Sequence, residues 1–162
     1  MQIVITMAGQ GSRFKKVGVT VPKHEITVRG KTLFEWAMRS LSDFVNEQFF
    51  FVVRHGQYQE DKLRQLIAQA GIRHYQLVEV DTLTSGQAST VMAVAPRLDT
   101  KDSLAVYNID TFVEPGMIRQ ADLTNCDGSL TTFTAAGDHW SFVQLNAAGD
   151  VVDVVEKRRV SS

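Results

Sequence analysis

The chain contains little cysteine and little proline. Its 162 residues include one cysteine, Cys126, and three prolines. Because one cysteine cannot form a disulfide within the chain, the sequence is typical of a reducing compartment, and we interpret Cys126 as a small apolar core residue. No stretch is rich enough in proline, glycine and serine to be a linker. We therefore expect a single domain over residues 1–162.

Long apolar runs and an excess of charge of one sign are also missing. No apolar run approaches the roughly 20 residues of a transmembrane helix, and the N-terminus lacks the basic region and cleavage site of a signal peptide. The formal net charge is −1, so no basic field attracts nucleic acid or an anionic membrane. We expect a cytoplasmic protein with neither of these as a partner.

Apolar segments of strand length alternate with segments of helical composition. Helices of about 10–13 residues between strands predict βαβ units in an α/β fold with a mostly parallel sheet. The spacing of Thr32 and Glu35 is that of a capping box, which predicts the start of a helix. The expected strands are 3–8, 48–53, 75–80 and 103–107, the expected helices are 33–44, 57–69 and 86–95, and residues 9–31 are expected to be a loop.

The pattern changes after Cys126. Residues 130–135, 141–145 and 151–155 have the composition of short strands, with no helical segment between them. Glycine-containing turn signals at 137–138 and 148–150 separate these segments. The sequence therefore predicts an antiparallel addition at the edge of the sheet.

A glycine loop, Gly9–Ser12, directly follows the first expected strand. Glycines allow a close approach to a ligand, and free backbone N–H groups in such a loop favour anions. Arg13 and Lys23 follow at short offsets, and two cations suggest a polyphosphate more than a single carboxylate. The resulting hypothesis is a nucleoside triphosphate site. The alternatives are a structural turn without a ligand and two solvated surface cations.

Two other phosphate motifs fit this region less well. A dinucleotide-binding fingerprint needs a third glycine where Phe14 stands, and the expected helix begins about twenty residues too late. Gly30–Thr32 resembles the end of a P-loop, but the required earlier glycine is Glu25. Thr32 is better explained as a helix cap, and a Rossmann-type oxidoreductase domain is the weaker hypothesis.

Asp110 lies just past the last parallel strand. A carboxylate at the carboxyl edge of such a sheet is well placed to hold Mg²⁺, although it could equally cap the following segment. The histidines have no metal-ligand spacing.

Further segments complete an ordered set of motifs. They are Met7–Phe14 with Gly-x-Gly-Ser-Arg-Phe, Val21–Lys23 with Pro-Lys, Val28–Met38, Thr84–Ser89, Val106–Asp110, and Val154–Lys157 with Glu-Lys. From residue 3 to about 157 this set resembles the sugar-phosphate nucleotidyltransferases, or nucleoside-diphosphate-sugar pyrophosphorylases. The resemblance implies a three-layer, Rossmann-like (GT-A-like) α/β fold with a mostly parallel sheet and antiparallel edge strands.

The resemblance also implies a reaction. A sugar 1-phosphate or related phosphate monoester attacks the α-phosphorus of a nucleoside triphosphate, and pyrophosphate leaves, with Mg²⁺ as cofactor. Catalysis then consists mainly of positioning and charge neutralisation. The implied roles are phosphate binding by Gly9, Gln10, Gly11 and Ser12, stabilisation of pyrophosphate by Arg13, neutralisation near the α-phosphate by Lys23, base contact by Gly86 and Gln87, Mg²⁺ binding by Asp110, and acceptor binding by Glu156 and Lys157.

The chain departs from the family at His24 and Glu25, where many relatives have small or apolar residues, and at Thr32, where proline is usual. It also stops at Ser162, before the second metal-binding aspartate of the family. We therefore expect a C-terminally truncated domain or a short homologue with impaired chemistry. The alternative function is a nucleotide- or sugar-nucleotide-binding module without turnover. The base, the sugar and any homo-oligomer stay open.

Overall fold

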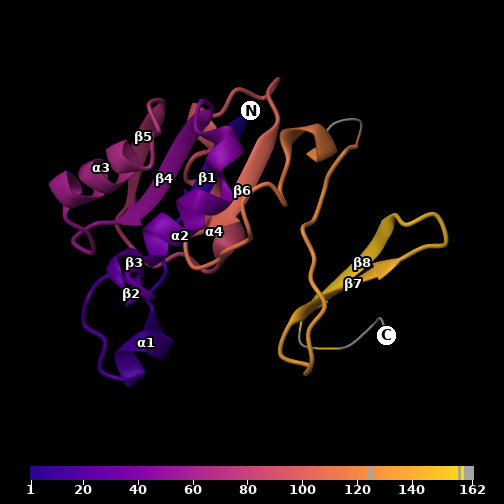
Figure 1. The fold of residues 1–162 in the computed structure, drawn as a ribbon, viewed down its shortest axis with the longest axis horizontal. Coiled ribbons are helices and arrows are strands. Elements are labelled where there is room, and N and C mark those ends of the chain that lie inside the picture. The colour runs from indigo at the N-terminus through magenta and orange to yellow at the C-terminus, as the bar shows by residue number, and fades with distance from the viewer. Residues whose placement is uncertain (124–125, 157, 159–162) are drawn as a thin grey trace. The chain divides into compact units, whose positions relative to one another are not determined.

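The computed structural model describes residues 1–123, 126–156 and 158 (Figure 1). Its contacts divide the chain into two compact units, Met1–Asp127 and Gly128–Ser162. Each unit is described by itself, and the single domain over residues 1–162 stays a prediction. Within the described residues, no helix combines the length and the apolar character that a bilayer crossing requires.

The first unit contains a four-stranded parallel sheet with the order β5-β4-β1-β6. All four strands were predicted from their apolar runs, with boundaries within about two residues. The chain leaves β1 toward β4 and β5 and then returns to place β6 on the other side of β1. The strands are β1 (Gln2–Thr6), β4 (Gln48–Arg54), β5 (Tyr75–Val80) and β6 (Leu104–Asn108).

Helices cover both faces of this sheet (Figure 1). Helices α2 (Leu33–Ser40) and α3 (Glu60–Gln69) cover one face, and the segment from α4 (Gln87–Met92) to Leu98 covers the other. Successive strand residues point to opposite faces, so each strand feeds two cores. One core contains Ile3, Ile5, Phe34, Phe49, Phe51, Leu63 and Ile67, and the other contains Val4, Phe50, Val52, Val78 and Val94.

The predicted capping box at the start of α2 is confirmed. The Glu35 N–H donates to Thr32 Oγ1 at 3.1 Å, and the Thr32 N–H donates to Glu35 Oε2 at 2.7 Å. These bonds satisfy backbone groups that the first helical turn leaves without partners. The Thr32 N–H also lowers the pKa of the Glu35 carboxyl group.

Residues 9–31 are more ordered than the predicted loop. They contain α1 (Ser12–Lys16), a 3₁₀ turn (Lys23–Glu25) and a hairpin of β2 (Thr27–Val28) and β3 (Lys31–Thr32). Helix α1 begins within the glycine loop, so the late helix start that we expected is also wrong. All residues of α1 keep exposed surface, and such a helix has no apolar periodicity by which a sequence could reveal it.

The second unit contains an antiparallel hairpin of β7 (Ser141–Leu145) and β8 (Val151–Glu156). These two strands were predicted, and they pair as a two-stranded sheet of their own. The third predicted strand, residues 130–135, is wrong because the segment is irregular and largely exposed. Together with the parallel sheet, the hairpin confirms the α/β fold class with added antiparallel strands.

The prediction of Cys126 as a core residue is also wrong. The residue is exposed and lies in the irregular segment before the second unit. Its apolar character alone could not reveal this, because burial depends on a neighbouring element to pack against.

Candidate functional site

The loops at the carboxyl ends of the parallel strands carry most of the predicted site residues. The strand order reverses between β1 and β6, and open α/β sheets bind ligands at such a point. The register pairs Thr6 with Asn108 there. Gly9–Ser12 follows β1, Gly56–Gln59 follows β4, Gly86 and Gln87 follow β5, and Asp110 follows β6.

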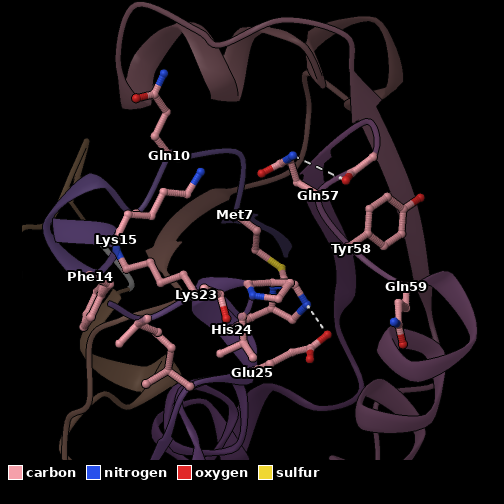
Figure 2. Close-up of a pocket in the computed structure, with 18 residues that line it drawn as sticks. Met7, Gln10, Phe14, Lys15, Lys23, His24, Glu25, Gln57, Tyr58 and Gln59 are labelled. Atoms are coloured by element: carbon pink, nitrogen blue, oxygen red, sulfur yellow. Dashed lines mark hydrogen bonds and ion pairs between the residues drawn. The ribbon is translucent and has the colours of Figure 1, made fainter. Parts of the chain in front are cut away.

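A pocket of about 560 Å³ lies between the glycine loop and the turn after β4. Figure 2 shows Gln10 and Lys15 on one side of it and Gln57, Tyr58 and Gln59 on the other. Within the described part of the chain, the backbone N–H groups of the glycine loop donate no hydrogen bond to another backbone group. Unpaired N–H groups beside a pocket are the donors that an anion needs.

Lys23 and Asp110 are in direct contact. Lys23 Nζ lies 2.5 Å from Asp110 Oδ2, and both side chains are partly exposed. The predicted phosphate-binding cation and the predicted metal ligand therefore lie side by side. Among the described residues, no group of three or more histidine, cysteine and acidic side chains could bind a metal. Asp110 would accordingly need ligands from a substrate to complete a metal site.

Asn108 connects the end of β1 to the start of α4. Its Oδ1 accepts hydrogen bonds from Thr6 Oγ1 at 3.1 Å and from Gln87 Nε2 at 2.7 Å. Gly86 precedes α4, and its carbonyl accepts the Thr90 N–H at 3.1 Å. This arrangement holds Gln87 beside Asn108, which ends β6 two residues before Asp110.

Arg13 and Ser12 are exposed and do not line the pocket. Helix α1 instead brings Lys15 to the pocket, a cation that the sequence interpretation did not include. Glu156 ends β8 and belongs to the second unit. Lys157 lies outside the described residues.

The structure also gives a place to His24 and Glu25, which the sequence marked only as departures from a family pattern. His24 is buried, with 4% of the residue exposed, and burial lowers its pKa. Its Nε2 has no hydrogen-bond partner among the described residues and lies 3.7 Å from Glu25 Oε1. Lys62 Nζ on α3 donates to Glu25 Oε2 at 2.5 Å.

A second cluster holds the pocket wall opposite the glycine loop. The Tyr58 hydroxyl donates to the Glu79 carboxylate, and His55 Nδ1 lies 3.1 Å from Glu79 Oε2. Burial together with the neighbouring carboxylate raises the pKa of Tyr58 to about 12. The sequence interpretation did not include this turn in the site. Its position directly after an expected parallel strand could have indicated it, because loops after parallel strands share one edge of the sheet.

Comparison with known proteins gives a family and several solved structures. Residues 3–148 match the family model of the MobA-like NTP transferase domain. A nucleoside-diphosphate-sugar pyrophosphorylase from Vibrio cholerae RC9 is 35% identical, with a TM-score of 0.85 over 98% of this chain and 68% of that chain. No curated protein sequence gives a significant match.

Two further solved structures share the fold at lower identity. The inositol-1-phosphate CTP transferase from T. maritima is 20% identical, with a TM-score of 0.72 over 99% of this chain and 65% of its own. The UTP-bound UGPase from Acinetobacter baumannii is 20% identical, with a TM-score of 0.67 over 99% of this chain and 69% of its own. The present chain thus spans about two thirds of the length of these proteins.

Proposed function

Because the chain belongs to the MobA-like NTP transferase family and is a sugar-phosphate nucleotidyltransferase by family, we propose that it transfers a nucleotidyl group from a nucleoside triphosphate. The acceptor is a sugar 1-phosphate or a related phosphate monoester, and pyrophosphate is released. In this proposal both substrates are small molecules, the compartment is the cytoplasm, and Mg²⁺ is the cofactor.

The observation that carries the proposal is the Lys23–Asp110 pair beside the glycine-loop pocket. An ammonium group and unpaired backbone N–H groups can bind phosphate oxygens, and a carboxylate can bind the accompanying metal. These groups lie at the reversal of strand order, where open α/β sheets bind ligands. A triphosphate site therefore explains their arrangement better than a purely structural ion pair does.

Asp110 and the glycine loop fit a magnesium ion that is bound together with a triphosphate. Mg²⁺ is usually bound by one or two carboxylates together with substrate phosphates and water. Asp110 supplies one partly exposed carboxylate, and the triphosphate would supply the remaining charged oxygens. When bound there, the ion would neutralise charge on the phosphates. Lys23 would then leave Asp110 and turn to a phosphate oxygen.

The other residues would divide the substrates between them. Backbone N–H groups of Gly9–Ser12 would hold the triphosphate, Lys23 would neutralise charge at the α-phosphate, and Arg13 would stabilise the leaving pyrophosphate. Gln87, oriented by Asn108, and Gly86 would contact the base. Glu156 and Lys157 would hold a hydroxyl and the phosphate of the acceptor.

The solved relatives support both substrate classes. One is a nucleoside-diphosphate-sugar pyrophosphorylase, one is an inositol-1-phosphate CTP transferase, and one is a UGPase with bound UTP.

The experiment is a substrate panel that measures pyrophosphate release. Each of the common nucleoside triphosphates is incubated with Mg²⁺ and a set of sugar 1-phosphates and inositol phosphates. We expect one pair to give turnover, and Lys23→Ala to lower kcat by roughly 10²–10³-fold, as removal of one charge-stabilising donor does. Lys101→Ala, an exposed lysine before β6, is the matched control. Equal rates for the two variants would contradict the proposal.

One observation favours a second function, a nucleotide-binding module without turnover. Among the described residues, Asp110 is in no group of three or more histidine, cysteine and acidic side chains that could hold a metal ion. This alternative predicts stabilisation by a triphosphate, which binds the native state, without pyrophosphate release. A thermal-shift measurement with the same panel separates the two functions.

A further inference from the structure

The Lys23–Glu25 turn is held by ion pairs on two sides. Lys23 pairs with Asp110 after β6, and Glu25 pairs with Lys62 on α3. Both nitrogen-to-oxygen distances are 2.5 Å. The turn therefore connects the end of the sheet with a helix on its face, and a single 3₁₀ turn separates the two contacts.

The two ion pairs differ in burial. The Glu25 carboxylate is only 8% exposed, whereas the Asp110 side chain is 40% exposed. A partly buried pair is screened less by salt and water than an exposed one, and removing one partner leaves a costly buried charge. We therefore take Glu25–Lys62 as the permanent contact and Lys23–Asp110 as the exchangeable one.

The segment that leads into this turn is largely exposed. All residues of α1 keep exposed surface, and Val17 and Val21, which flank the approach to the turn, are 76% and 49% exposed. Within the turn, the Glu25 N–H donates to the Pro22 carbonyl at 2.9 Å, and His24 is buried below it. Figure 2 shows His24 and Glu25 together in the pocket, joined by their contact.

We propose that Lys62, acting through Glu25, is a positioning residue for Lys23. The ion pair fixes the turn against α3, so that the Lys23 ammonium stays within reach of a bound phosphate after it releases Asp110. Small displacements of a charge-stabilising group are expensive, since about 1 Å can cost about 10²-fold in rate. This inference rests on the proposed function, because it assigns Lys23 to a substrate phosphate.

The test is a double-mutant cycle between Lys23 and Lys62, read by calorimetric binding of inorganic tripolyphosphate to the full chain. We expect Lys62→Met to weaken binding by about tenfold, equivalent to about 1.4 kcal/mol. Lys62→Arg keeps the charge and is expected to stay within about twofold. In the Lys23→Ala background, Lys62→Met is expected to cost nothing further, because coupled residues are not additive.

Two additional variants keep the test independent of folding and of net charge. Glu25→Gln/Lys62→Met removes both charges, avoids a buried unpaired carboxylate, and is expected to bind like Lys62→Met. Arg64→Met breaks the exposed Arg64–Glu60 pair on the same helix and controls for charge on α3. Any loss of affinity in Arg64→Met measures the general electrostatic effect of removing one positive charge from α3. We expect the loss in Lys62→Met to exceed it.

The outcomes distinguish this inference from the proposed function. If Lys62→Met weakens binding equally in the wild-type and Lys23→Ala backgrounds, or not at all, Lys62 does not act through Lys23 and the inference is overturned, while Lys23 keeps its proposed role. If Lys23→Ala itself binds tripolyphosphate like the wild type, the phosphate role of Lys23 fails and the inference fails with it. Coupling with rescue by arginine supports the inference.

Discussion

Lys23 and Asp110 are separated by most of the first unit's sequence, yet their charged atoms lie 2.5 Å apart. The reason is topological. Lys23 follows β1 and Asp110 follows β6, and these strands are hydrogen-bonded neighbours at the reversal of strand order. In this ion pair, the Lys23 ammonium occupies the place of the metal ion proposed for Asp110. The Asp110 carboxylate likewise occupies the place of the phosphate proposed for Lys23.

A first prediction follows from this contact. Lys23→Met should raise the affinity of the protein for Mn²⁺ without nucleotide, because the ammonium no longer competes for Asp110. Partly exposed pairs contribute about 0.2–1 kcal/mol, so we expect an increase of up to about fivefold. Electron paramagnetic resonance of free Mn²⁺ measures it. Asp110→Asn should remove the gain, and an unchanged affinity in Lys23→Met would count against Asp110 as the ligand.

A second prediction concerns Asn108. Asn108→Leu removes the acceptor that orients Gln87, so it should raise the KM for the nucleoside triphosphate several-fold, as the loss of about one hydrogen bond of roughly 1 kcal/mol does. Gln87→Ala should have the same effect, and the double variant should be no worse. Steady-state kinetics with the substrate pair from the panel provide the measurement. Additive losses would mean that the two side chains act separately.

A third prediction concerns the capping box. Thr32→Ala should lower the free energy of unfolding by about 1 kcal/mol at pH 7, because it removes the cap of α2. Urea denaturation measures the loss, and Ser42→Ala, an exposed hydroxyl beyond the same helix, is the control. A loss no larger than that of the control would show that α2 does not depend on its cap.

The same motif predicts a pH dependence. The folded-state pKa of Glu35 lies below the ordinary glutamate value of 4.5, because its carboxylate accepts the Thr32 N–H. Its ionised carboxylate therefore stabilises the fold at pH above the unfolded pKa, and the contribution is lost as pH falls through the lower folded pKa. The difference in unfolding free energy between wild type and Glu35→Gln should be present at pH 7. It should disappear at pH values below the folded-state pKa of Glu35. A difference that does not change with pH would show that the ionised Glu35 carboxylate does not stabilise the fold.

A fourth prediction concerns His24, whose pKa is lowered overall. Burial is the main cause, the Lys62 charge lowers the pKa further, and the Glu25 charge opposes the shift. Lys62→Met should raise the His24 pKa, and Glu25→Gln should lower it further. Imidazole resonances followed by NMR titration measure both shifts. His55, whose pKa the Glu79 carboxylate raises, is an internal control that should not respond. A His24 resonance insensitive to both substitutions would contradict the described cluster.

A fifth prediction addresses the core. Phe51 is fully buried, with its ring centroid 5.7 Å from that of Phe34 and 5.8 Å from that of Phe49. Phe51→Ala should cost about 3–5 kcal/mol of unfolding free energy. Leu104→Ala, at a side chain that is 45% exposed, should cost much less. Comparable losses in urea denaturation would mean that the sheet does not bury its faces as described.

Local patterns predicted the elements of the first unit well. The apolar run of β4 and the spacing of Thr32 and Glu35 are signals contained within a few neighbouring residues. Helix α1 and the exposed position of Cys126 were not predictable in this way. Segment 130–135 has strand composition but forms no strand, since composition alone does not supply a partner strand.

The candidate site was predictable only in part. The glycine loop, Lys23 and Asp110 could be grouped because loops after parallel strands share one edge. Glu25 and Lys62 are thirty-seven residues apart, and no motif spacing connects them. For Arg13 the motif was informative but the local geometry was not. The motif gave Arg13 a role at pyrophosphate, whereas α1 directs Lys15 to the pocket. The role of Arg13 stays a prediction.

Nucleotidyl transfer at the Lys23–Asp110 site is tested most directly by following the label of a nucleoside triphosphate. The triphosphate carries ³²P at either the α- or the γ-position, and the reaction contains Mg²⁺ and the acceptor phosphate. We predict that α-label enters a nucleotide-linked product and γ-label leaves as pyrophosphate, with both processes strongly reduced in Lys23→Ala. Release of γ-label as inorganic phosphate, or transfer that is unaffected by Lys23→Ala, would contradict the account.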